Sequence, residues 1–183
     1  MNLPNKLTVA RMLAIPAIVA LMMVGGRACG MAAVVLFALA SFTDFLDGHI
    51  ARSRGLVTDF GKFMDPIADK LLVTAVMIMM VERSLMAGWV LTLFVAREFI
   101  VSGLRLVAAG KGVVLAAGKL GKLKTVCQMA ALIVSLSVYY LSMGAPAQAW
   151  HIASQVLIYA ALALSVWSGA DYIWRNREII SQM

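Results

Sequence analysis

The sequence predicts an all-α, polytopic membrane protein with six transmembrane helices. Of its 183 residues, 62% are hydrophobic and only 14% are charged, and the mean hydropathy is +0.90. Apolar segments recur along the whole chain, and each approaches the roughly 20 residues that a helix needs to cross a bilayer. Short polar or glycine-containing joints separate these segments. We therefore expect one integral-membrane domain that spans residues 1–183.

The apolar segments lie at about residues 8–25, 30–46, 66–82, 86–109, 125–143 and 149–174. The first is expected to stay in the membrane, because it contains Arg11 and Pro16 and no small-residue cleavage pattern follows it. The second ends in a polar stretch. The third is expected to open at Pro66, since proline is tolerated in the first turn of a helix. The fourth is interrupted by Arg97 near its middle.

The distribution of lysine and arginine predicts the orientation, because these residues resist translocation. They gather at both termini and in the second and fourth joints, whereas the first and third joints carry Arg27 and Arg83 and the fifth carries neither type. Both termini and the second joint are expected to face the cytoplasm. The net charge of +7 suits anionic lipid headgroups, and nucleic acid is not expected as a partner.

Four of the nine acidic residues flank the second joint, namely Asp44, Asp47, Asp65 and Asp69. On a helix, the first two project from one side with Gly48 and Ala51, and Arg52 lies beside them. The small residues leave room for a bulky group against the backbone. The last two aspartates are one helical turn apart. If the second and third helices pack antiparallel, all four carboxylates converge.

Converging carboxylates repel one another or take up protons unless a cation joins them. Ligand sets made of oxygen alone favour Mg²⁺ or Mn²⁺ over Zn²⁺. Two metal ions about 3.5–4 Å apart clamp the attacking and leaving oxygens of a phosphoryl displacement. The alternative is that the aspartates cap helices or pair with Arg52, Lys62 and Lys70. That alternative explains one aspartate more readily than four at this spacing.

The motif Asp44-x₂-Asp47-Gly48-x₂-Ala51-Arg52-x₈-Gly61-x₃-Asp65-x₃-Asp69 resembles the signature of the CDP-alcohol phosphatidyltransferases, with every position filled. The flanking segments P-N-K-L-T-V-A-R, A-R-E-F and G-K-L-K-T-V-C-Q are similar to those of bacterial phosphatidylglycerophosphate synthases. The resemblance implies transfer of a phosphatidyl group from CDP-diacylglycerol to sn-glycerol 3-phosphate, with CMP released. It also implies a homodimer in a bacterial inner (plasma) membrane.

The resemblance further implies a role for each residue of the motif. It makes the four aspartates the ligands of a two-metal site with Mg²⁺ or Mn²⁺, and Asp69 also the candidate catalytic base. The residues expected to border or hold the CDP moiety are Asn5, Thr8, Asp44, Gly48, Ala51, Arg52 and Gly61.

Glycerol 3-phosphate is an anion, so its phosphate needs a cationic pocket. Arg97 lies where an arginine is unfavourable unless it is paired or lines a wet cavity. Arg105 follows on nearly the same helical face, and Lys124 opens the fifth apolar segment. We expect these three residues to bind the acceptor's phosphate. The alternative for Arg97 is an ion pair with Glu98 or Asp171.

Other functions remain open at this point. A member of the same family with another acceptor is the main alternative: serine has no phosphate to occupy the cationic pocket, inositol phosphate has one, and phosphatidylglycerol is a third acceptor. An ion or proton transporter, with Asp44, Asp47 and Asp171 as relay groups, is the alternative from a different class. Transport favours acidic residues spread through the membrane depth, whereas these gather at one face.

Overall fold

The computed structural model forms six α-helices within the residues that it describes: α1 (Leu3–Val24), α2 (Gly26–Ser53), α3 (Asp59–Glu82), α4 (Gly88–Gly110), α5 (Lys119–Leu141) and α6 (Gln148–Arg175). The structure describes residues 3–53, 59–113, 115, 118–142, 148–177 and 179, and the side chains of these except at 3–5, 44–53, 59–63, 119 and 148–150. The prediction of an all-α chain of six helices is confirmed.

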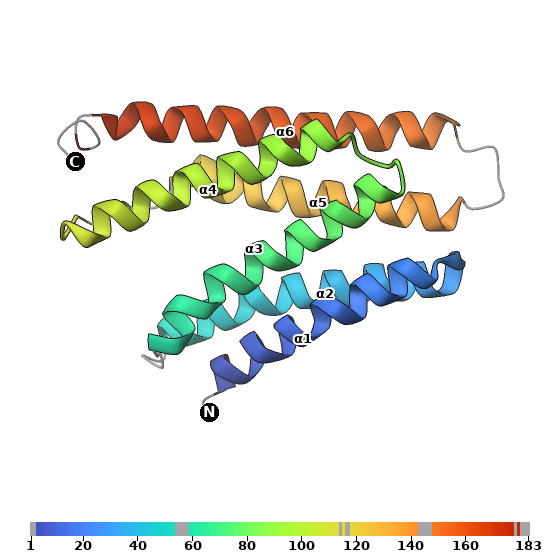
Figure 1. The fold of residues 1–183 in the computed structure, drawn as a ribbon, viewed down its shortest axis with the longest axis horizontal. Helices are drawn as coiled ribbons and strands as arrows, with labels where there is room; N and C mark the ends of the chain where they lie inside the picture. The colour runs from blue at the N-terminus through green and yellow to red at the C-terminus, as the bar shows by residue number, and fades with distance from the viewer. Residues whose placement is uncertain are drawn as a thin grey trace.

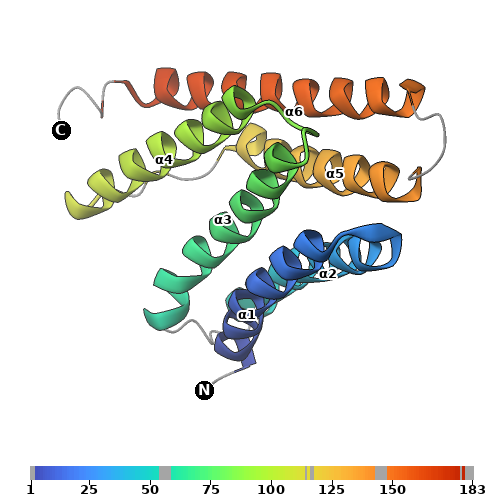
Figure 2. The same ribbon diagram turned by 45° about the vertical axis from the view of Figure 1, so that its right-hand side comes forward.

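The helices form two groups, which are joined by α3 and by a direct contact between α2 and α5 (Figures 1 and 2). α1 packs against α2, and α5 packs against α6 with α4 alongside. α3 crosses between the groups and contacts α1, α4 and α5. Because α3 belongs to both groups, a side chain on it can meet residues from the first and the last parts of the chain.

Successive helices run in opposite directions, which sorts their ends into two sets (Figure 1). The N-terminal end of α1, the C-terminal end of α2, the start of α3 and the C-terminal ends of α4 and α6 lie toward one end of the bundle. We call this the aspartate end, because Asp65 and Asp69 lie in the N-terminal half of α3. The α1–α2 and α3–α4 connections lie at the opposite end (Figure 1).

Among the described helices, α1, α2, α5 and α6 are long and apolar enough to cross a membrane. α3 and α4 have suitable lengths of 24 and 23 residues but carry more charge. The charged residues of α3 are at its aspartate end, apart from Glu82 at its other end, and those of α4 are Arg97, Glu98 and Arg105. The two helices that depart from a plain membrane-spanning composition are therefore those that contribute most of the charged side chains of the site.

The helices around the second joint are longer than the apolar runs predict. α2 continues to Ser53, and α3 already begins at Asp59. The expectation that Pro66 lies in the first turn is wrong, because Pro66 lies inside α3. The length of an apolar run indicates how much of a helix lies in the membrane. The helix itself continues into polar sequence as long as its backbone hydrogen bonds are satisfied. The whole segment from Asp44 to Ser53 is thereby helical.

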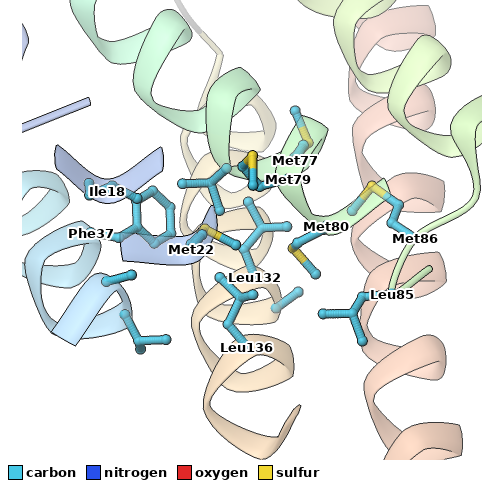
Figure 3. Close-up of a cluster of buried hydrophobic side chains, with 14 of the residues drawn as sticks. Ile18, Met22, Phe37, Met77, Met79, Met80, Leu85, Met86, Leu132 and Leu136 are labelled. Carbon is cyan, nitrogen blue, oxygen red and sulfur yellow. The ribbon is translucent and has the colours of Figure 1, made fainter. Parts of the chain in front are cut away.

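The core of the bundle contains buried side chains from all six helices, and Figure 3 shows the part of it where α1, α2, α3 and α5 meet. Ile18 and Met22 of α1 lie beside Phe37 of α2, and the sulfur-containing side chains of α3 face Leu132 of α5. Methionine adapts to irregular gaps between helices, which suits this crossing. Near the opposite end, Gly30 of α2 packs directly on the Tyr140 ring, where a β-carbon would overlap it. The core therefore holds α3 firmly against both helix groups.

Candidate active site

Two of the four predicted metal ligands, Asp65 and Asp69, have described side chains, and both lie on α3 four residues apart. One helical turn separates them, so they share a face. Asp44 and Asp47 lie on the final turns of α2, but their side chains are outside the described set. The same holds for the side chains of Asn5, Gly48, Ala51, Arg52 and Gly61.

The N-terminal half of α1 supplies two buried polar side chains to this face of α3. Thr8 has an exposed fraction of 1%, and its hydroxyl donates a hydrogen bond to Oδ1 of Asp65. Arg11 is one turn further along α1, has an exposed fraction of 3% and lies within electrostatic range of Asp69. α1 therefore holds a donor and a positive charge against the two carboxylates.

Asp69 lies at the centre of the charged residues. Arg11, Lys70 and Lys124 all act on its carboxylate electrostatically. Its Oδ1 is buried and has no hydrogen-bond partner among the described residues. A buried carboxylate oxygen without a partner is unfavourable, and it is the kind of hard donor that Mg²⁺ and Mn²⁺ prefer. The described part of this site thus fits a divalent cation.

In the described set, no group of three or more His, Cys, Asp or Glu side chains lies close enough to hold a metal ion. Asp44 and Asp47, the other two predicted ligands, are not in that set. Asp65 and Asp69 therefore represent half of the predicted ligand group.

A narrow pocket of about 40 Å³ opens beside Asp69, between α3, α4 and α5. Its charged lining residues are Asp69, Lys70, Glu98 and Lys124. Lys124 is buried, with an exposed fraction of 2%, and forms an ion pair with Glu98. Two carboxylates and two ammonium groups from three helices therefore share this pocket.

Arg97 of α4 is directed mainly at α6. Its Nε donates to the Ser165 carbonyl at 3.2 Å, and its Nη2 donates to Oγ of Ser168 at 2.9 Å. Its Nη1 lies 3.5 Å from a carboxylate oxygen of Glu98. The ion pair with Glu98, which was one alternative for Arg97, is thus present, whereas Asp171 pairs with Arg175 at 2.8 Å.

Arg105 lies about two turns beyond Arg97, toward the end of α4, and is exposed. Its Nε donates to the Leu115 carbonyl at 3.2 Å, and it lies within electrostatic range of Lys70. The fold therefore links Arg105 to the pocket through Lys70. Lys70 and Lys124 also lie within electrostatic range of each other.

A larger cavity, of about 460 Å³, lies at the opposite end of the bundle. Its lining includes Arg83, His151 and several serines, with no carboxylate among the described lining residues. Phosphoryl chemistry on metal ions requires carboxylate ligands, so the candidate site is the smaller pocket next to Asp69.

Three residues of the site, Arg11, Lys70 and Glu98, were not predicted as functional. Each carried a signal in the sequence, because Arg11 and Glu98 are charged residues inside apolar segments and Lys70 directly follows Asp69. In the sequence, Arg11 and Lys70 are explained by the lysine and arginine distribution that predicts the orientation, so they do not stand out as site residues. Their position beside the carboxylates depends on how α1, α3 and α4 cross.

Comparisons with known proteins agree with the residue motif. The CDP-alcohol phosphatidyltransferase family matches residues 1–167. A protein of Bacillus subtilis named CDP-diacylglycerol–glycerol-3-phosphate 3-phosphatidyltransferase is 39% identical, with 98% of this chain and 97% of that protein covered. A Rickettsia typhi protein of the same name is 42% identical, with 93% and 94% covered.

A relative with another name is also similar. A cardiolipin synthase (CMP-forming) from rice is 36% identical, with 96% of this chain but 58% of the rice protein covered. The family match extends over most of the chain and includes all four aspartates on α2 and α3. This chain belongs to the CDP-alcohol phosphatidyltransferase family.

Proposed function

We propose that the protein transfers the phosphatidyl group of CDP-diacylglycerol to sn-glycerol 3-phosphate, giving phosphatidylglycerophosphate and CMP. The observation that carries this proposal is the shared pocket, in which Asp69 lies beside Lys70 and Lys124. The carboxylates, which would hold metal ions beside the pyrophosphate, then adjoin a cationic site for an acceptor that carries its own phosphate. The names of the bacterial relatives support the same substrates.

In this reaction, the primary hydroxyl oxygen of glycerol 3-phosphate bonds to the phosphorus that carries diacylglycerol. The bond from that phosphorus to the bridging oxygen breaks, and CMP leaves with the electron pair. Asp69 accepts the proton of the attacking hydroxyl, which requires a carboxylate within reach of it. The buried Oδ1 of Asp69, which has no hydrogen-bond partner among the described residues, supports this role. The chain supplies alignment and charge compensation.

We assign the metal ligands to Asp44, Asp47, Asp65 and Asp69. Bound Mg²⁺ or Mn²⁺ would offset the negative charge of the pyrophosphate and of the leaving CMP. The hydrogen bond from Thr8 orients Asp65, and Arg11 offsets the charge of Asp69 from the side of α1. The nucleotide would lie along the end of α2, bordered by Gly48, Ala51 and Arg52 and by Gly61 of α3, with Asn5 nearby.

The phosphate of the acceptor would be held by Lys70, Arg105 and Lys124. Lys70 joins the predicted set because it lines the pocket and acts on both Asp69 and Arg105. Arg97 supplies positive charge from behind Lys124, since its nitrogens already contact α6 and Glu98. A phosphate monoester carries up to two negative charges, so it needs several cationic side chains around it.

The orientation, the membrane and the assembly of the protein are proposed from the charge pattern and from its family. The aspartate end would face the cytoplasm of a bacterial inner membrane, where glycerol 3-phosphate and the nucleotide are soluble. Lysine and arginine concentrate in the segments of the sequence that lie at that end of the bundle. A homodimer within the membrane is the expected assembly.

The rice relative makes cardiolipin synthesis the second candidate, with phosphatidylglycerol as the acceptor. That lipid carries a phosphodiester with a single negative charge, so it needs fewer cations than the pocket offers. Inositol phosphate has a monoester and fits the same cations, whereas serine has no phosphate to meet them. The three cations therefore favour a small phosphomonoester acceptor.

The proposal is tested by incubating purified enzyme and CDP-diacylglycerol with each of four acceptors and measuring CMP release. Glycerol 3-phosphate should give the largest kcat/KM, exceeding serine and phosphatidylglycerol by at least about a hundred-fold, or roughly 2.7 kcal/mol. EDTA should abolish the reaction, and Mg²⁺ or Mn²⁺ should restore it. Faster CMP release with inositol phosphate or phosphatidylglycerol would refute the assigned acceptor, and full activity in EDTA would refute the metal site.

A further inference from the structure

Glu98 is the second carboxylate of the pocket, and it faces the same lysine as Asp69. Its ion pair with Lys124 joins α4 to α5. Asp69 attracts the same ammonium group from α3. The ammonium group of Lys124 can therefore pair with either of two carboxylates. Of these, Asp69 belongs to the family's aspartate motif and Glu98 does not.

An uncompensated lysine beside a metal ligand weakens the metal site. The ammonium group repels a divalent cation and competes for the carboxylate that should bind it. Asp69 is already close to Arg11 and Lys70. Lys124 without its own partner would add a third positive charge and increase this repulsion, so the cationic acceptor pocket and the carboxylate site are in electrostatic conflict.

Glu98 is held in place independently of Asp69. Arg97 Nη1 lies 3.5 Å from the Glu98 carboxylate, and the other nitrogens of Arg97 are fastened to α6 by Ser165 and Ser168. Gly169 allows this close contact, because a β-carbon there would lie 3.0 Å from Cγ of Arg97. The α4–α6 contact thus fixes the direction of the Glu98 carboxylate toward Lys124.

We propose that Glu98 is a positioning residue that neutralises Lys124 and keeps its ammonium group off Asp69. The cationic acceptor pocket and the metal-binding carboxylates can then share one cavity without weakening each other. This proposal rests on the proposed function, because it takes Asp69 as a metal ligand. It predicts opposite effects from removing either member of the pair.

The test uses Mn²⁺ alone as the probe and follows thermal unfolding of the full chain in detergent, without substrates. Binding of Mn²⁺ to the folded protein raises the Tm, and the dependence on concentration gives the apparent affinity. Glu98→Gln leaves one extra positive charge, so the half-saturating Mn²⁺ concentration should rise about ten-fold. Lys124→Met leaves one extra negative charge, and the same concentration should fall.

The double variant Glu98→Gln/Lys124→Met has no net charge change and should return to within about three-fold of the parent. A purely structural role for the pair predicts that the variants weaken binding in the same direction. The matched control is Glu82→Gln, the same substitution at an exposed position at the end of α3. It should leave the Mn²⁺ dependence unchanged.

The possible outcomes distinguish a failure of this proposal from a failure of the proposed function. A parent protein with no Mn²⁺ shift would overturn the metal site and the role of Glu98 together. A normal parental shift that Glu98→Gln leaves unchanged, or a double variant as weak as Glu98→Gln, would overturn only the role of Glu98. If Glu98→Gln fails to fold, Lys124→Met decides the matter, since an unchanged or higher Mn²⁺ requirement contradicts the proposal.

Discussion

The hydroxyl of Thr8 is expected to control turnover through Asp65, and Thr8→Val tests this. Valine keeps the shape of threonine and removes the hydroxyl. With an exposed fraction of 1%, Thr8 lies where water has little access to replace the lost hydrogen bond to Asp65. A hydrogen bond to a charged group contributes about 1.5–3 kcal/mol. If that contribution is lost in the transition state, kcat falls by about 10- to 150-fold.

The assay measures initial rates of CMP release while each substrate is varied in turn. Because Thr8 contacts a carboxylate of the site, Thr8→Val should lower kcat and leave the KM for CDP-diacylglycerol nearly unchanged. Thr8→Ser keeps the hydroxyl and is the matched control, with kcat within about three-fold of the parent.

Two results would refute this reasoning. A Thr8→Val variant with kcat within about two-fold of the parent would show that the hydrogen bond to Asp65 contributes little to turnover. A raised KM for CDP-diacylglycerol with kcat preserved would show instead that Thr8 contacts the nucleotide directly, as the family resemblance implies.

Three further outcomes are expected. Arg105→Ala should raise the KM for glycerol 3-phosphate by about ten-fold or more, with Arg105→Lys rescuing only part of the loss, whereas an effect confined to CDP-diacylglycerol would contradict the assigned pocket. Ser84 has a φ of 59°, so Ser84→Gly should stabilise the protein by about 1 kcal/mol, seen as a Tm higher by about 2–4 °C in detergent. In a background without the native cysteines, Lys111→Cys should react with an impermeant thiol reagent only from the cytoplasmic side and Arg27→Cys only from the other; labelling of both from one side would overturn the orientation.

For Arg97, the local sequence pattern does not give the direction of the side chain. The sequence identifies Arg97 as a charge that must be paired or hydrated inside an apolar segment, and the structure agrees. The periodicity of α4 cannot tell whether that charge faces the pocket or a neighbouring helix. The contact with α6 decides the question, because Arg97 donates hydrogen bonds to the Ser165 carbonyl and to Ser168, and its stem packs closely against Gly169.

The sequence by itself determined that the protein has six helices, that it is a membrane protein and that two carboxylates lie one turn apart on α3. These features follow from the length of apolar segments and from helical spacing, which are local properties of the chain. Tertiary structure alone decided that Thr8 meets Asp65, 57 residues away, and that Glu98 pairs with Lys124. Membrane helices are apolar on nearly every face, so their sequences do not mark which face turns inward. The crossing of α3 over α1, α4 and α5 makes that choice, and with it the composition of the site.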